Sequence, residues 1–179
     1  MDAAKLQLAK QTLSTWCSKN EPRLPSLIQE LVQVGFPIND AIVPVTDQTL
    51  LMLICASTQL SSDYVAFVMQ HPKLDVNAKD KCGRSALYLA CRAGSFQKTQ
   101  LLLGHPSIDA DARTNGGETP LMAAVQSMNS ELVQLLLERN FNPFLLNSVR
   151  WTARDYAIRM GGPDSQITQL IDKTILLYS

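Results

Sequence analysis

Residues 83–91 read Gly-Arg-Ser-Ala-Leu-Tyr-Leu-Ala-Cys, and residues 117–125, 34 positions later, read Gly-Glu-Thr-Pro-Leu-Met-Ala-Ala-Val. The similarity continues on both sides, because His71-Pro72 recurs as His105-Pro106 and the leucines at 101–103 recur at 135–137. An internal repeat of this length is typical of a chain built from stacked copies of one small unit.

Further copies of the unit lie before and after this pair. Thr49 precedes Ser85 by 36 positions, Thr152 follows Thr119 by 33, and a more divergent unit comes first in the chain. Because stacked repeats share one continuous core, we expect one domain over residues 1–179. Its units are expected at approximately 1–40, 41–78, 79–112, 113–145 and 146–179.

Each unit reads as two short helices followed by a loop. Thr119 is a good N-cap, and Pro120 suits the first helical position, where its missing N–H is not needed. Ser130 is predicted to cap a second helix with a broad apolar stripe, which consists of Leu132, Val133, Leu135, Leu136 and Leu137. Turn residues follow at Asn142-Pro143, which indicates a loop or hairpin before the next unit.

These residues resemble the ankyrin repeat, most clearly at 74–78 and at 80–94, and the resemblance covers roughly residues 3–177. It implies an all-α fold, an ankyrin-repeat solenoid of about five helix-turn-helix units with hairpin loops. In the family, a motif histidine ties each hairpin to its neighbour, and its loss here implies weaker hydrogen bonding between units. The departures from the motif are Met52, Tyr88, Met122 and Asp155 in place of this histidine, Asp47 and Arg150 in place of the hairpin-tip glycine, and Met128 in place of the glycine between the helices.

Composition argues against several classes of partner. The chain has 16 Lys and Arg and 16 Asp and Glu, so its formal net charge is zero, which disfavours a general nucleic-acid binder. The longest apolar run, residues 50–56, is far shorter than a membrane span, and the first residues lack a signal-peptide pattern. We therefore expect a soluble protein that binds no nucleic acid and does not insert into a membrane.

The four cysteines, Cys17, Cys55, Cys82 and Cys91, have no metal-ligand spacing. Two of them hold equivalent positions in the repeat, so we expect small core residues in a reducing compartment, and no metal. The expected location is intracellular, cytoplasmic and/or nuclear. Cys82 is the exception, because it falls at a hairpin tip and should be a reactive thiol.

Nothing in the sequence forms a recognisable catalytic constellation. His71 and His105, the only two histidines, hold equivalent positions after a helix and before a proline, which the repeat explains. No nucleophile has an assigned base, and the Gly-Gly pairs at 116–117 and 161–162 lack the context of a phosphate loop. We expect no enzyme, no catalytic residue and no cofactor.

The stacking instead predicts a binding surface, because successive hairpin tips and inner helices line one concave face. Trp151 stands out, since Trp and Arg are enriched among residues that dominate binding energy, although it could instead fold over Val149 or Phe144. Tyr88 and Met122 either line this face or lie buried between hairpins, and most other positions could be ordinary solvated loop residues. Lys98 and Gln134 are expected on the opposite, convex side. By resemblance, the candidate partner-binding residues are Lys81, Arg84, Tyr88, Arg92, Asn115, Glu118, Met122, Gln126, Trp151 and Arg159.

The chain's last segment is unusually apolar. Asp164 or Ser165 can cap a helix whose Ile167, Leu170, Ile171 and Thr174 form one buried stripe, but residues 175–178 are apolar on every side. This end either docks onto a partner, mediates self-association or frays.

The expected function is therefore non-catalytic binding of another protein, as an adaptor, inhibitor or targeting subunit. The alternative is a structural subunit that is embedded in a larger assembly through its terminal caps or its convex face.

Overall fold

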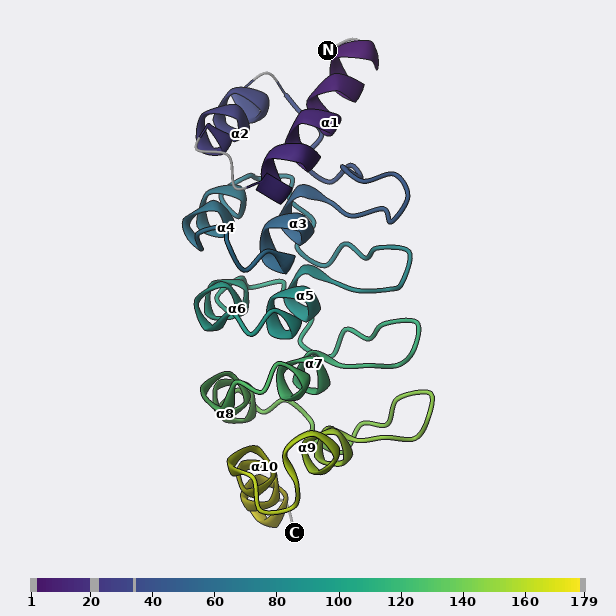
Figure 1. The fold of residues 1–179 in the computed structure, drawn as a ribbon. Helices are drawn as coiled ribbons and strands as arrows, with labels where there is room; N and C mark the ends of the chain where they lie inside the picture. The colour runs from purple at the N-terminus through teal and green to yellow at the C-terminus, as the bar shows by residue number, and fades with distance from the viewer. Residues whose placement is uncertain (1–2, 20–22, 34, 178–179) are drawn as a thin grey trace.

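A computed structural model describes residues 3–19, 23–33 and 35–177, and these residues form pairs of helices joined by loops (Figure 1). The helices are α1 (Ala3–Lys19), α2 (Leu24–Gln33), α3 (Leu50–Ala56), α4 (Asp63–Val68), α5 (Ala86–Arg92), α6 (Phe96–Leu103), α7 (Pro120–Gln126), α8 (Ser130–Glu138), α9 (Ala153–Gly161) and α10 (Gln166–Leu177).

The helices stack in two columns. The inner column holds the odd-numbered helices and the outer column the even-numbered ones, and the hairpins project from the inner side (Figure 1). Each inner helix from α3 to α9 packs on the next, as do the outer helices from α4 to α10. One helix pair falls within each expected unit, and the expected all-α solenoid of helix-turn-helix units is confirmed.

The inner helices begin with the same side-chain cap. Thr49, Ser85, Thr119 and Thr152 each accept a hydrogen bond from the backbone N–H three residues later, and Pro120 occupies the first turn of α7. For α8 the cap is Asn129, so the prediction of Ser130 was wrong by one residue. The Asn129 side chain accepts from the Leu132 N–H at 3.1 Å and also donates to the Gly94 carbonyl of the preceding unit at 3.0 Å.

Small residues let the inner helices approach closely. Ala90, Ala124 and Ala157 are all buried, and bulkier side chains there would hold neighbouring units apart. Three of the four cysteines are also buried, and burial raises the pKa of Cys17, Cys55 and Cys91 to about 12. Cys82 is exposed at its hairpin, as expected.

Lys98 lies inside the solenoid, so its predicted position on the convex surface was wrong. Its side chain begins on α6, is 3% exposed, and donates from Nζ to the carbonyls of Ile54 at 2.8 Å and Ser57 at 2.6 Å. Burial lowers the pKa of Lys98. The ammonium group therefore satisfies carbonyls at the C-terminal end of α3, where a helix favours positive charge.

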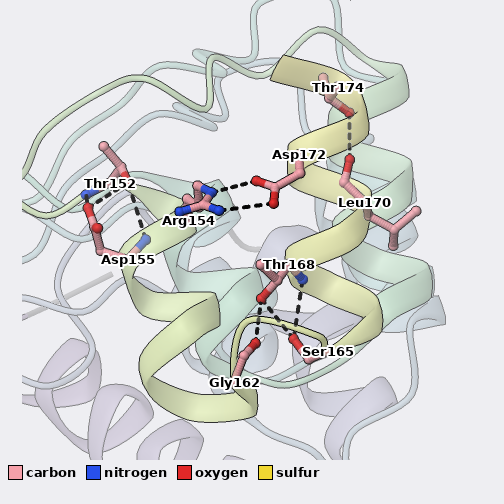
Figure 2. Close-up of polar contacts among 9 residues, drawn as sticks. All are labelled: Thr152, Arg154, Asp155, Gly162, Ser165, Thr168, Leu170, Asp172 and Thr174. Carbon is pink, nitrogen blue, oxygen red and sulfur yellow. Dashed lines mark hydrogen bonds and ion pairs between the residues drawn. The ribbon is translucent and has the colours of Figure 1, made fainter. Parts of the chain in front are cut away.

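Polar contacts hold the last two helices together (Figure 2). Arg154 stands where the three preceding units have a buried leucine, at positions 51, 87 and 121. Its guanidinium forms a two-pronged ion pair with the Asp172 carboxylate, at 2.5 Å from Nε and 3.0 Å from Nη2. Ser165 caps α10, since its Oγ accepts from the Thr168 N–H, and Thr168 Oγ1 in turn donates to the Gly162 carbonyl at 2.9 Å.

The apolar end of the chain is helical as far as the structure describes it. Of the stripe predicted on α10, Ile167 and Ile171 are buried, and Leu170 and Thr174 are half-buried. Leu176 and Leu177 are 73% and 79% exposed. Tyr178 lies outside the described residues. Whether this segment docks onto a partner, mediates self-association or frays in solution stays a prediction.

Candidate protein-binding face

The inner face consists of the exposed and half-buried residues of the hairpins and of the odd-numbered helices. Its hairpins are joined by backbone hydrogen bonds from Lys81 N to Thr46 O at 3.0 Å, from Asn115 N to Cys82 O at 2.9 Å and from Ser148 N to Gly116 O at 2.9 Å. Neighbouring units are therefore connected without the missing motif histidine.

A hydrogen-bond network around Glu118 joins three successive units, and we call it the Glu118 network. Glu118 directly precedes the N-cap of α7, and its carboxylate accepts from Tyr88 Oη of α5 at 2.5 Å and from Tyr156 Oη of α9 at 2.7 Å. Gln126, at the end of α7, donates to the same carboxylate at 3.2 Å, and Asn147 donates to Tyr156 Oη at 3.0 Å. Tyr88 thus occupies a histidine position of the motif and takes over a contact between units.

The network keeps Glu118 ionised. Its partial burial favours the neutral acid, but hydrogen bonds from Tyr88, Tyr156 and Gln126, together with the positive charge of Arg92, outweigh burial and lower the pKa of Glu118. Burial and the bond to this carboxylate raise the pKa of Tyr156 to about 12, so its hydroxyl remains a donor.

Trp151 extends the network toward the last hairpin. Its ring meets the Tyr156 ring edge-on, with centroids 5.2 Å apart and planes at 74°, and the Arg159 guanidinium lies 5.0 Å from its centroid. Val149 and Phe144 remain at least half exposed, so the ring packs on α9 and does not cover them.

The remaining candidates divide between hairpin contacts and the core. Arg84 pairs with the buried Asp80 carboxylate at 2.7 Å, Lys81 Nζ donates to the Pro44 carbonyl at 3.0 Å, and the Asn115 side chain donates to the Lys81 carbonyl at 2.9 Å.

Two candidates, Met122 and Tyr88, are buried and lie outside the exposed face. Met122 on α7 is 1% exposed, so its side chain is not available to a partner. Tyr88 is 5% exposed and acts through its bond to Glu118. The structure brings Tyr88, Arg92, Glu118 and Gln126 into one cluster, and Trp151 and Arg159 join it through Tyr156.

Sequence reasoning missed two members of this cluster, Tyr156 and Asn147. A signal for Tyr156 existed, since it stands in α9 where the preceding unit has Ala123. Asn147 holds the hairpin position of Asp80, and its Oδ1 accepts from the N–H groups of Val149 and Trp151 just as Asp80 accepts from its own turn.

Replacing Glu118 should change how stability depends on pH. Because the pKa of Glu118 is lowered in the folded state, its stabilising contribution is present above its unfolded pKa and is lost as pH falls through the folded pKa. We expect Glu118→Gln to reduce the free energy of unfolding by about 1 kcal/mol at pH 7, and the difference from wild type to shrink as pH falls from the unfolded pKa through the lowered folded pKa. Urea unfolding at each pH measures this.

The comparison of the two proteins controls for other acids, since the pKa values of Asp155 and Asp172 are also lowered and both proteins retain these groups. A stability difference that stays constant from pH 7 to pH 3 would contradict the role of the ionised carboxylate.

The model of the family described as ankyrin repeats (3 copies) matches residues 15–114 and 100–175 of this chain. The chain therefore belongs to the ankyrin repeat family. Such repeats are generally protein–protein interaction modules and typically not enzymes. The comparison with curated proteins gives no match.

Two further observations concern the described residues alone. No cluster of three or more His, Cys, Asp or Glu side chains among them could hold a metal ion. Within the same residues, every helix is too short or too polar to cross a membrane.

Proposed function

We propose that this chain is a non-catalytic interaction module that binds a partner protein through its inner face, as an adaptor, inhibitor or targeting subunit. The Glu118 network is the observation that carries the proposal. It holds hairpins and inner helices of three units in one arrangement, so a partner meets a surface that is already ordered and loses less entropy on binding. The pattern of the cysteines in the sequence supports an intracellular location as part of this proposal.

Side chains that dominate binding energy are expected where this ordered surface meets solvent. Trp151 is half-buried against Tyr156 and Arg159, and Met160, the residue after Arg159 on α9, is 46% exposed. An aromatic ring held by its neighbours offers a large contact area at a small cost in conformational entropy.

Removal of the ring should weaken partner binding. We expect Trp151→Ala to raise the Kd of a partner captured from native extract by about 30-fold, which corresponds to about 2 kcal/mol. Met160→Ala tests the same area without removing the contact to Tyr156. Titration of the purified partner, with a melting curve for each variant, separates affinity from stability.

The control for this experiment is the pair Gln100→Ala and Gln134→Ala, two exposed positions on the outer helices α6 and α8. If these changes weaken binding while Trp151→Ala and Met160→Ala leave it unchanged, the solenoid is used from its outer side.

The structural-subunit alternative draws on the chain's apolar end. A groove between α8 and α10 is lined by Leu137, Leu170 and Leu177 among others, and Leu177 is largely exposed. The solution mass of the purified protein discriminates the two functions, since a monomer fits a separable binding module and obligate association fits a subunit.

A further inference from the structure

We propose that the inner face selects a partner segment that is acidic and carries an aliphatic or aromatic side chain beside the acidic group, held by Arg92 and Arg159. This inference rests on the proposed function and specifies the chemistry of the partner. It follows from how charges are distributed over the face.

The carboxylates of the inner face already have partners within the chain. Asp80 pairs with Arg84 at 2.7 Å, and Asp47 lies 3.9 Å from Lys81. Glu118 accepts from two phenols and an amide, and Asp155 accepts from the N–H and hydroxyl of Thr152, both at 2.7 Å. A basic partner would therefore compete with these internal donors for the carboxylates.

Several guanidinium groups on the inner face have no carboxylate bound to them within the described residues. Arg92, Arg150 and Arg159 are exposed, and within the described part of the chain none has a carboxylate within 4.0 Å. Arg92 lies close enough to Tyr88 and Glu118 to act on the pKa of both, but the phenols and the amide occupy the Glu118 carboxylate, which leaves the remaining guanidinium donors of Arg92 for another acid. The chain as a whole is neutral, and its inner face carries three exposed guanidinium groups that have no ion-pair partner among the described residues.

The two proposed arginines occupy equivalent positions two units apart. Arg92 ends α5, Gln126 ends α7 and Arg159 lies near the end of α9, and these three helices are stacked neighbours (Figure 1). A single extended segment that crosses the three helices can therefore meet both guanidinium groups in turn.

The surroundings of Arg159 add an apolar requirement. Its guanidinium lies over the Trp151 ring, which restricts its orientation before a ligand arrives. Exposed Val149 is held in the same turn as Trp151, since the N–H groups of both donate to Asn147 Oδ1, and exposed Met160 follows Arg159 on α9. An apolar side chain should therefore accompany the acidic group of the segment.

The test uses the full chain and three fluorescent libraries of 12-residue peptides. All contain the same apolar residues, and their charged positions hold Asp and Glu, Lys and Arg, or Asn and Gln. A single-stranded oligonucleotide of 20 thymidines serves as a polyanion probe without peptide character. We expect binding by the acidic library alone, with an affinity that falls as salt increases.

Variants of Arg92 and Arg159 test whether these two side chains account for the binding of the acidic peptides. Arg92→Gln/Arg159→Gln should weaken the acidic peptides by about tenfold or more and flatten their salt dependence, and Arg92→Lys/Arg159→Lys should restore part of both. The matched control Arg23→Gln/Arg139→Gln removes two exposed arginines beside the outer helices α2 and α8 and should change affinity less than about twofold. Equal melting temperatures of these variants show that the fold is retained.

The other outcomes overturn the proposal. Preference for the neutral or basic library, no binding by any library, or acidic binding that survives loss of both arginines excludes arginine-directed selection. Equal arginine-dependent binding of the oligonucleotide indicates a polyanion site. Neutral peptides whose binding is lost in Met160→Ala would leave the proposed function standing, whereas binding that no inner-face variant affects would remove both.

Discussion

Leu136→Ala should lower the free energy of unfolding by about 2–5 kcal/mol, because the change removes a fully buried side chain and leaves a cavity. Leu136 lies on α8, which packs against α7 of its own unit and against α6 and α10 of the neighbouring units. In a repeat array, stability arises from such contacts between adjacent units as well as within them.

Reversible urea unfolding followed by circular dichroism measures this loss. Gln134→Ala is the control, since it truncates an exposed side chain on the same helix and should change stability by less than about 0.5 kcal/mol. A loss of stability below about 1 kcal/mol for Leu136→Ala would show that packing of the buried leucines of the outer helices does not hold the units together.

Gly83→Ala should be the second large effect, with an expected loss of about 2–4 kcal/mol. Gly83 has a φ of +75°, a conformation that side chains rarely adopt, and an added Cβ would lie 2.7 Å from the backbone nitrogen of Asn115 in the next hairpin. The substitution therefore strains its own hairpin and pushes the neighbouring one away.

Gly35→Ala separates these two causes. Gly35 has nearly the same φ, +77°, but an added Cβ there meets nothing within 4 Å. Gly35→Ala should therefore cost only the backbone strain, about 1–2 kcal/mol. Equal thermal destabilisation of the two variants would contradict the importance of hairpin stacking at Gly83.

The tip positions show how the tertiary context can override a local preference. Asp47 and Arg150 stand where the repeat favours glycine, yet both adopt positive φ, at 57° and 61°. Met128 does the same between α7 and α8. The hairpin geometry is thus preserved at positions where the motif residue is absent, because stacking against the adjacent unit outweighs the local conformational cost.

The sequence did not show how deeply two side chains, those of Lys98 and Met122, are buried. Lys98 looked like a surface lysine of an outer helix, but it reaches carbonyls 44 and 41 residues earlier in the chain. Met122 looked like a candidate contact and is buried. A helical pattern indicates which side of a helix is apolar, and it does not say how far a long side chain can extend into the adjacent unit.

The repeat period and the helix caps depend only on residues close together in the sequence. The cap side chains bond to backbone groups three residues away, at Thr49, Ser85, Thr119 and Thr152. Because a period near 34 residues also requires equivalent units to stack, the amino-acid sequence alone was sufficient to predict the helices, their order and the family.

The Glu118 network depended on the folded chain. Tyr88 and Tyr156 lie 30 residues before and 38 residues after Glu118, and their bonds form only when three units are stacked at a particular rotation and distance. Local patterning does not encode that geometry, because it results from the packing of all the side chains between the units. Only the tertiary structure could therefore decide which polar residues of the inner face bind one another and which guanidinium groups have no carboxylate partner.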